Sequence, residues 1–358
     1  MNLSFQHFDL PLARSWATAR GKTAVAKVVV VELIDKDGVV GRGEAAPISR
    51  YKESVTSVQA FLRRIDPRHL SAESVTQSLT YLKRLAPGEM SAKCAIDIAL
   101  LDIAAKRAKK SLYDHLNLGF REKHHVTSFS IGLGEPTIVR ENVLAASDYP
   151  ILKMKLGGAQ DKTSWQALRE VAPTKLVRAD ANEAWRTKEE ALKNIEWLAG
   201  DKYVEFVEQP LPASTPPADW IWLKQRSPLP IFADESHHSA AETALAAECF
   251  HGVNIKLVKS GGVTEGFYAL QEARKAGLKT MLGCMVETSV LISAGAHLTE
   301  LCDYLDLDGN LLITEDPFAG VTARNGMLSF AEATEKFGLR VSVRKRAGSN
   351  SNRVSDKS

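Results

Sequence analysis

Residues 151–182 read ILKMKLGGAQDKTSWQALREVAPTKLVRADAN, two β-like runs on either side of an amphipathic helical segment. The first run, ILKMK, ends in lysines, and the second, LVRAD, ends in a carboxylate. One strand, one helix, a second strand and two short loops need about this length. The stretch therefore predicts one β–α–β unit with charged residues at its strand ends.

The same unit recurs along the chain, each time with a polar residue where the β-like run ends. At intervals of 27, 28, 26 and 22 residues, successive runs reach Lys153, Asp180, Glu208, Asp234 and Lys256. In a (β/α)₈ barrel the active site lies at the carboxyl ends of the strands. The pattern therefore predicts an α/β protein with a (β/α)₈-type barrel whose acids and lysines gather at one mouth.

The regions around these units predict the domain organisation. Residues 1–122 contain two β-like runs around the turn signal DKDG and then a long helical pattern, which predicts an α+β capping domain. The barrel is expected at 123–320, and a segment at 321–345 is expected to pack back on the capping domain and complete it. Residues 346–358 are rich in Ser and Asn and poor in apolar residues, so a disordered tail is predicted there.

The composition argues against several classes of function. The 358 residues are 44% hydrophobic and 25% charged, and no apolar run approaches the ~18 residues of a membrane span. The net charge of +3 comes from the C-terminal tail, so the body lacks the basic stripe of a nucleic-acid-binding protein. The four cysteines show no CxxC spacing and the N-terminus no signal peptide, which together predict a cytoplasmic protein.

Asp180, Glu208 and Asp234 are candidate metal ligands, because consecutive barrel strands would place them side by side. Three hard oxygen ligands with room for water and substrate suit Mg²⁺. The alternative is that each acid caps the helix that follows it. That alternative is weaker for three acids in register, since Glu is not a favoured N-cap residue. We therefore predict one bound Mg²⁺ per chain.

Lys153 and Lys155 lie two positions apart on one run, so both side chains share the inward face of the predicted strand. Lys256 also falls on an inward position. A buried lysine is costly unless it is paired or functional, although a single one can reach solvent along its own stem. Neighbouring cations would lower the pKa of each lysine and make it a competent general base.

The motifs KMKLGG, DANEAW, VEQP, ADES and NIKLVKSGG resemble the signature set of the enolase superfamily, specifically its muconate-lactonising subgroup. The resemblance covers essentially the whole chain, including an AxxAxDxAxxD-like helix from Ala92 to Asp102. It implies that the three acids bind Mg²⁺, that Lys155 and Lys256 are acid/base groups on opposite faces of the substrate, and that Lys153 lies beside the substrate carboxylate.

Bases on both faces favour 1,1-proton transfer at the carbon α to a carboxylate, and hence racemisation or epimerisation through an enediolate. Bound Mg²⁺ and Lys153 would stabilise the charge that develops on the carboxylate oxygens. The same groups also serve muconate cycloisomerases and o-succinylbenzoate synthases. The lysines alone therefore leave those two activities open.

Asp306 and Asp308, in YLDLDG, end the eighth run and share one face. Two carboxylates attract a cationic group and repel a dianion such as muconate or succinylbenzoate. The element is similar to the Asp-x-Asp pair that holds the substrate α-ammonium in dipeptide epimerases, and GCMVETS, with Cys284 and Met285, is similar to that family too. We therefore predict an isomerase that epimerises dipeptides, although one aspartate of the pair could instead bond backbone amides.

The N-terminal lid departs from the pattern of L-Ala-D/L-Glu epimerases, which typically place an arginine there. In TARGKTAVAK the corresponding position is Thr23, with Arg20 and Lys22 nearby, and PISRYKES offers Arg50 and Tyr51. A lysine lacks the bidentate fork with which arginine binds a carboxylate. We therefore predict a dipeptide epimerase whose preferred epimerised residue need not be glutamate. The sequence does not identify the dipeptide.

Two further questions stay open at this level. A non-catalytic relative that binds a peptide or metabolite without turnover is the alternative from a different functional class. The sequence also leaves open whether the chain forms a homo-oligomer.

Overall fold

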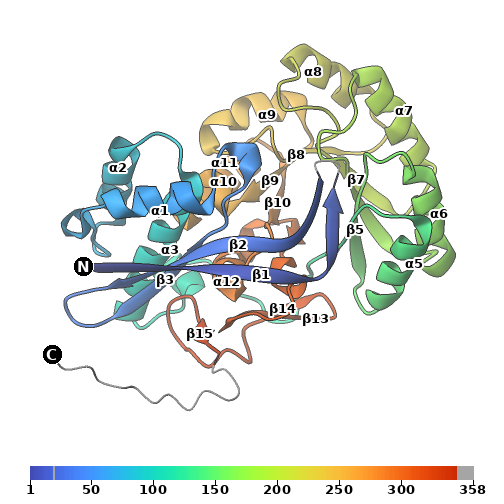
Figure 1. Cartoon of the computed structure of the whole chain (residues 1–358). Helices are drawn as coiled ribbons and strands as arrows, with labels where there is room; N and C mark the ends of the chain where they lie inside the picture. The colour runs from blue at the N-terminus through green and yellow to red at the C-terminus, as the bar shows by residue number, and fades with distance from the viewer. Residues whose placement is uncertain (19–20, 345–358) are drawn as a thin grey trace.

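The structure is a computed structural model that describes residues 1–18 and 21–344. The tail predicted at 346–358 lies outside the described residues, and so does Arg20. Eight parallel strands form one sheet in sequence order, with helices outside it, and a three-stranded antiparallel sheet stands beside this barrel (Figure 1). The α/β barrel predicted from the sequence is confirmed.

The capping domain combines a long hairpin with three helices. Its sheet has the order β1 (Asn2–Thr18), β2 (Gly21–Ile34), β3 (Val40–Ala45). The helices are α1 (Val55–Arg64), α2 (Val75–Leu85) and α3 (Met90–Arg107), with the short α4 (Leu112–His115) after them. The β1–β2 ribbon runs from this sheet to the barrel (Figure 1), where Leu133 N donates to Ala17 O at 2.8 Å. The end of β1 therefore lies next to the barrel mouth.

The helix α3 packs directly on β3 because two glycines allow the backbones to approach. A Cβ atom added at Gly41 would lie 2.0 Å from Ala99 O, and one at Gly43 would lie 1.8 Å from Ala95 O. The alanines on this face of α3 are fully buried. The AxxAxDxAxxD pattern is therefore, in part, a close-packing surface.

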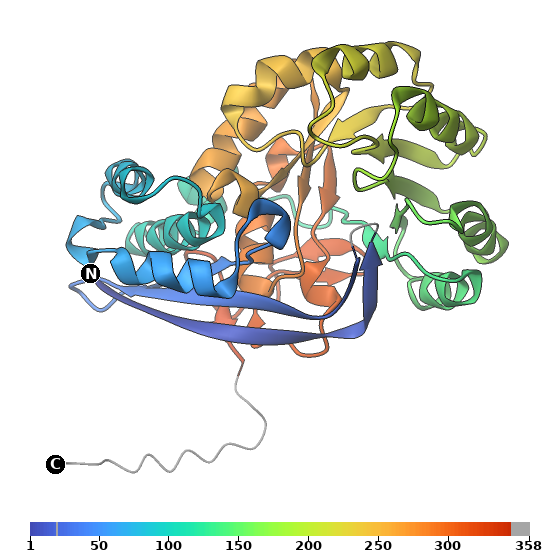
Figure 2. The same cartoon turned by 45° about the horizontal axis from the view of Figure 1, so that its top comes forward.

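The barrel strands are short and parallel to their neighbours. They are β4 (Phe129–Ile131), β5 (Ile151–Lys155), β6 (Leu176–Asp180), β7 (Val204–Glu208), β8 (Ile231–Ala233), β9 (Gly252–Lys256), β10 (Lys279–Gly283) and β11 (Tyr304–Asp306). The pairing of β6 with β7 has one irregularity, between Val177 and Ala179. Thr127 and Leu305 form an isolated parallel bridge that brings the two edges together. Figure 2 shows the barrel helices on the outside of these strands.

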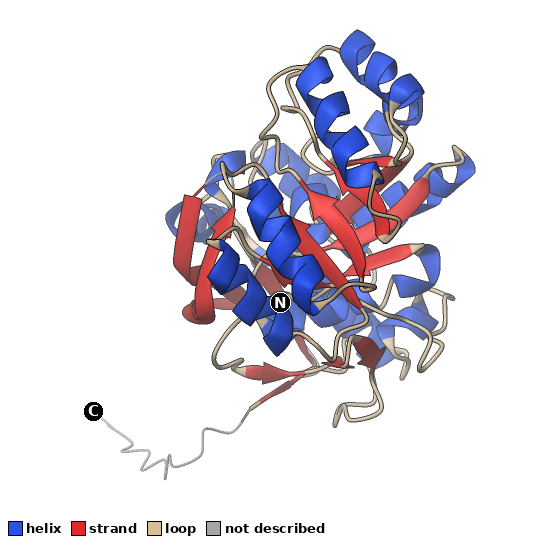
Figure 3. Cartoon of the chain, turned by 90° about the vertical axis from the view of Figure 1, so that its right-hand side faces the viewer, coloured by secondary structure: helices blue, strands red, loops and turns tan. Residues whose placement is uncertain are grey.

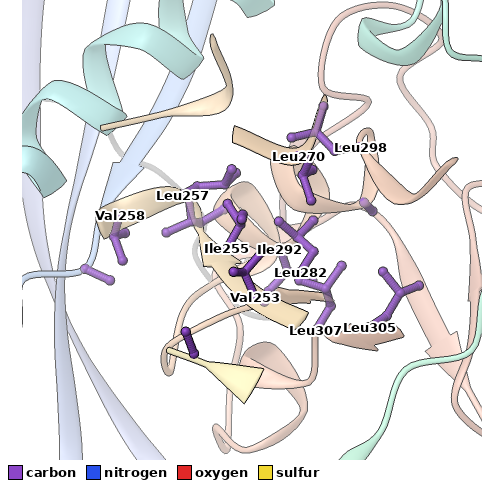
Figure 4. Close-up of a cluster of buried hydrophobic side chains, with 14 of the residues drawn as sticks. Val253, Ile255, Leu257, Val258, Leu270, Leu282, Ile292, Leu298, Leu305 and Leu307 are labelled. Carbon is purple, nitrogen blue, oxygen red and sulfur yellow. The ribbon is translucent and has the colours of Figure 1, made fainter. Parts of the chain in front are cut away.

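Helices follow the strands along the chain, as the β–α–β pattern predicts. Figure 3 shows helices around the strands of the sheet. They are α5 (Pro136–Ala145), α6 (Asp161–Val171), α7 (Lys188–Ala199), α8 (Pro217–Arg226), α9 (Thr243–Cys249), α10 (Leu257–Ser260), α11 (Val263–Lys275) and α12 (Ser289–Ala296). Apolar side chains fill the layer between strands and helices, and Figure 4 shows Val253 and Ile255 of β9 packed with Leu270 and Leu298. Within the described residues, no helix has the length and apolar character needed to cross a membrane.

The C-terminal segment contacts both parts of the molecule. Its short strands are β12 (Phe318–Ala319), β13 (Thr322–Arg324), β14 (Met327–Ser329) and β15 (Ser342–Val343). Leu339 N donates to Asp102 of α3 at 2.8 Å, whereas Val321 N donates to Ser293 of α12 at 3.0 Å. The segment thus lies against the capping domain and the barrel together, and the division at residues 122 and 320 stays a prediction.

Candidate active site

Strand register brings the predicted site residues to one level of the barrel. Lys155 of β5 pairs with Asp180 of β6, and Asp180 pairs with Glu208 of β7. On the other side, Lys256 of β9 lies level with Gly283 and, through it, with Asp306 of β11. The strand-end residues therefore meet at the carboxyl end of the barrel, as predicted.

Lysine ammonium groups bridge the carboxylates at this level. Lys153 Nζ lies 2.7 Å from Asp306 Oδ2, 2.7 Å from Glu208 Oε2 and 3.2 Å from Asp180 Oδ2. Lys155 Nζ donates to Asp180 Oδ2 at 2.6 Å. Lys256 Nζ donates to Asp234 Oδ2 at 2.8 Å. The lysines and acids thus form one buried network in which each acid contacts at least one ammonium.

In this structure the pKa values of Lys153 and Lys256 are raised, in the direction opposite to that expected from the neighbouring cations. Burial does lower the pKa of both lysines, but their carboxylate neighbours act more strongly in the opposite direction. Asp306 and Glu208 hold the pKa of Lys153 well above its usual value. Asp234 likewise raises the pKa of Lys256. The acids outweigh the neighbouring cations because they lie within ion-pair distance of both ammonium groups.

Burial and neighbouring charges give the predicted metal ligands Glu208 and Asp180 different pKa values. Burial and the nearby Asp180 raise the pKa of Glu208 from 4.5 to about 7. Burial also opposes ionisation of Asp180, but Lys155 and Lys153 keep its pKa below the usual range. Three buried carboxylates that repel one another are the environment in which a divalent cation is favourable.

The carboxylate oxygens of these acids are suitable ligands for Mg²⁺. In this structure they contact lysine ammonium groups. Within the described residues, no three His, Cys, Asp or Glu side chains lie together in an arrangement that could hold a metal ion. Glu208 Oε2 is fully buried, and its 2.7 Å contact with Lys153 Nζ is an ion pair without normal hydrogen-bond geometry. A buried carboxylate oxygen beside two further acids suits a cation with oxygen ligands. The assignment of Asp180, Glu208 and Asp234 as ligands stays a prediction.

Three polar residues that sequence reasoning did not assign hold these acids in place. Lys259 Nζ donates to Asp234 Oδ1 and Asp234 O, both at 2.5 Å. Asn254 Nδ2 donates to Glu208 Oε1 at 2.8 Å, and Gln209 Oε1 accepts Asp234 N at 2.8 Å. All three lie within the quoted motifs NIKLVKSGG and VEQP, so their proximity to the predicted site residues was the available signal.

The Asp-x-Asp pair is divided between two tasks. Asp306 accepts from Lys153 Nζ at 2.7 Å and from the Ser128 hydroxyl at 2.7 Å. Asp308 accepts the backbone N–H of Ser130 at 2.7 Å, so the alternative of a bond to a backbone amide holds for this residue. Burial and the neighbouring Asp306 raise the pKa of Asp308 to about 6. Cys284 Sγ lies 3.8 Å from Asp308 Oδ1.

A cavity of about 650 Å³ opens above this network, between the barrel mouth and the capping domain. Its lining includes most of the predicted site residues, namely Lys155, Lys256, Asp306, Asp308, Cys284, Met285, Lys22, Thr23 and Arg50. The remaining acids and Lys153 are fully buried. Lys153, Asp180 and Asp234 each contact a lining residue, and Glu208 contacts Lys153 behind them. The structure therefore brings the predicted lysines and acids together around one cavity.

Two lid residues are engaged differently from the prediction. Arg50 Nε and Nη2 donate to the two carboxylate oxygens of Glu183, each at 2.8 Å, so its bidentate fork is used inside the protein. The ring of Tyr51 packs edge-on against His238, with 5.7 Å between ring centroids, and Tyr51 does not line the cavity. Arg50 and Tyr51 thus tie the capping loop to two barrel loops. Their roles in substrate binding stay predictions, as do those of Lys22 and Thr23.

Comparison with known proteins places this geometry in a family. Residues 138–344 match the enolase C-terminal domain-like family, and residues 6–117 match the N-terminal domain of mandelate racemase and muconate lactonizing enzyme. An L-Ala-D/L-amino acid epimerase from Pedosphaera parvula is 56% identical over 344 residues, which span 95% of this chain and 99% of that protein.

Two further relatives extend the comparison. An L-Ala-D/L-Glu epimerase from Bacteroides thetaiotaomicron is 36% identical over 331 residues, covering 92% of this chain and 85% of that protein. The crystal structure of a dipeptide epimerase from Enterococcus faecalis, complexed with Mg and L-Leu-L-Tyr, has a TM-score of 0.86 and 27% identity, with 95% and 98% of the two chains covered. The two family models together match most of the chain, and the chain belongs to the mandelate racemase and muconate lactonizing enzyme family within the enolase superfamily.

Proposed function

We propose that this protein is a Mg²⁺-dependent dipeptide epimerase that inverts the α-carbon of the C-terminal residue. The observation that carries the proposal is that Lys155 and Lys256 line one cavity together with Asp306 and Asp308. Lys155 ends β5 and Lys256 ends β9, so three strands separate them around the barrel. That separation suits two groups that act on opposite faces of one carbon.

Each side chain then has a chemical task. The neutral Nζ of one lysine removes the α-proton, and the ammonium Nζ of the other delivers a proton to the opposite face. The net charge of the pair is unchanged, so the same two groups serve both directions. Lys153 orients the substrate carboxylate by charge, and Asp306 with Asp308 binds the free α-ammonium. Bound Mg²⁺, held by Asp180, Glu208 and Asp234, supplies positive charge where the carboxylate becomes more negative.

The cavity favours an uncharged side chain on the epimerised residue. The guanidinium of Arg50 is already bound bidentately by Glu183, so it offers no free fork to a substrate carboxylate. Apolar residues dominate several stretches of the wall, namely Val25, Ala26, Ala46, Pro47, Ile48, Met285, Val286 and Leu312. Apolar walls stabilise apolar side chains through burial. We therefore propose that dipeptides with a neutral C-terminal residue are preferred to L-Ala-L-Glu.

The cycloisomerase and o-succinylbenzoate synthase activities are disfavoured by the same geometry. Asp306 and Asp308 are both buried beside the cavity and would repel the second carboxylate of a dianionic substrate. A non-catalytic binding protein is also disfavoured, because it would hold two lysines and several acids at one cavity without using them for proton transfer.

Proton NMR in D₂O with a dipeptide panel and Mg²⁺ tests the proposal. We expect the α-proton signal of the C-terminal residue to disappear as deuterium enters, and Lys155→Ala and Lys256→Ala each to abolish epimerisation. EDTA should stop the reaction and added Mg²⁺ should restore it. No exchange across a broad panel would favour the binding protein. L-Ala-L-Glu as by far the best substrate would refute the preference for neutral residues.

A cytoplasmic location and a homo-oligomeric state are separate proposals. The four cysteines are all free in the structure, which accords with a reducing compartment. Fractionation of the source cells and analytical ultracentrifugation would decide these two points.

A further inference from the structure

Asp97 in α3 belongs to the capping domain, but its carboxylate contacts the barrel. Its side chain is fully buried. Oδ2 accepts the backbone N–H of Thr264 at 3.0 Å, and Oδ1 accepts the Thr264 hydroxyl at 2.5 Å. Thr264 is the second residue of α11, so a capping-domain carboxylate satisfies the N-terminus of a barrel helix.

The turn that precedes α11 is pressed directly against α3. Gly261 and Gly262 have φ values of +93° and +129°, which side-chain-bearing residues rarely adopt. A Cβ atom at Gly262 would lie 2.2 Å from Asp97 Oδ2, and one at Gly261 would lie 2.8 Å from Cε of Met90. The double glycine therefore allows α3 to hold both the turn and the first residues of α11.

The segment held in this way is the one that carries Lys256. The helix α10 begins at Leu257, directly after Lys256, and ends at the double-glycine turn. All four of its residues are buried, and Figure 4 shows Leu257 and Val258 packed near Ile255 of β9. Lys259 in α10 also donates to Asp234. The backbone of Lys256 is thus fixed by its strand on one side and by the α10 turn on the other.

We propose that Asp97 is a positioning residue for the Lys256 side of the proton transfer, an inference that rests on the proposed epimerisation. Asp97 holds Thr264 and the double-glycine turn, which in turn hold α10 and Lys256. Lys155 lies across the mouth on β5, which leads into α6. A loss of the Asp97 contact should therefore displace Lys256 and leave Lys155 in place.

The test measures how fast each substrate epimer loses its α-proton in D₂O with Mg²⁺ present. Epimerisation rates alone cannot separate the two lysines, because the equilibrium constant sets the ratio of the two directions. The initial rate of deuterium exchange does separate the two lysines, because the lysine that removes the proton can also return deuterium to the same face. Lys155→Ala and Lys256→Ala identify which epimer each lysine deprotonates.

In Asp97→Asn, we expect exchange of the Lys256-dependent epimer to fall about tenfold or more, because displacements of ~1 Å cost up to ~10²-fold in rate. Exchange of the Lys155-dependent epimer should change less than about twofold. Thr264→Val, which removes only the hydroxyl donor, should show the same asymmetry to a smaller degree. If Asp97→Asn does not fold, Thr264→Val alone tests the positioning role of the Asp97–Thr264 contact.

Asp102→Asn is the matched control on the same helix. Asp102 is equally buried but accepts Arg42 N at 3.0 Å and Leu339 N at 2.8 Å, away from α11. It should lower thermal stability without making exchange asymmetric. An equal fall for both epimers in Asp97→Asn and Thr264→Val, or no change in either, overturns the positioning role. If the wild type exchanges no epimer of any dipeptide, the proposed function itself fails.

Discussion

Glu44 of β3 connects the capping sheet to α12 through a buried charge. Its side chain is fully buried, and it accepts Thr288 N at 2.9 Å and the Thr288 hydroxyl at 2.5 Å. Burial raises the pKa of Glu44 from 4.5 to about 7, although these hydrogen bonds act in the opposite direction. The perturbation of choice is Glu44→Gln, which removes the titrating group at nearly constant volume.

The size and the sign of the effect follow from the raised pKa of Glu44. A pKa of about 7 in the folded protein and 4.5 in the unfolded chain corresponds to roughly 3 kcal/mol. Between these values the folded state binds a proton that the unfolded chain has released. The contribution of Glu44 to stability is therefore fully present below pH 4.5 and is lost as the pH rises towards 7. Relative to wild type, Glu44→Gln should gain roughly 3 kcal/mol over this window.

Urea unfolding followed by tryptophan fluorescence, repeated in small pH steps from about 4.5 to about 7.5, measures this difference. Glu32→Gln is the control in the same sheet, because Glu32 pairs with Arg42 and its side chain is 39% exposed. An exposed pair of this kind contributes less than about 1 kcal/mol, so the control should follow the wild-type pH profile. Parallel profiles for wild type and Glu44→Gln would refute the assignment of a raised pKa.

Three further outcomes are expected. Asp306→Asn should lower kcat/KM about 10- to 100-fold for a free dipeptide, since charged hydrogen bonds contribute ~1.5–3 kcal/mol. If the variant prefers the free dipeptide to the N-acetylated dipeptide as strongly as wild type does, Asp306 does not bind the ammonium. Burial lowers the pKa of His297 to about 3, so the contribution of His297 to the free energy of unfolding should be lost as the pH falls from 6.5 towards 3, and urea unfolding of His297→Gln should lack this pH-dependent contribution. Gly43→Ala would place a methyl group 1.8 Å from Ala95 O and should cost about 1–3 kcal/mol or more, measured as a lower Tm. A Tm equal to that of Gly158→Ala, where the atom nearest to the added Cβ lies 3.5 Å away, would contradict that packing argument.

The elements that sequence periodicity could predict are the local ones. The barrel strands, the alternation with helices and the residues at the strand ends all follow from patterns within a few tens of residues. The long strand β1 was not predicted. It pairs with β2 from Asn2 to Thr18, with an irregularity between Pro11 and Trp16 that interrupts any simple alternation.

Contacts between distant residues were the part that sequence reasoning could not supply. Lys153 was expected beside a substrate carboxylate, yet its ammonium contacts Asp306, which lies 153 positions further along the chain. Arg50 was a candidate for substrate binding, yet Glu183 holds its guanidinium. The packing of whole helices and strands decides which charged partner a side chain contacts. The pKa of the side chain depends on that partner.

The amino-acid sequence by itself determined the barrel, the level at which its acids and lysines meet, and their chemical types. It could do so because strand period, unit length and residue class are local properties of the chain. Only the tertiary structure decided that Lys259 and Asn254 hold the acids, that Asp97 and Glu44 join the capping domain to the barrel helices α11 and α12, and that the pKa values of Lys153 and Lys256 rise. These depend on the distances between side chains from distant segments and on their removal from water, which arise only when the two domains pack together.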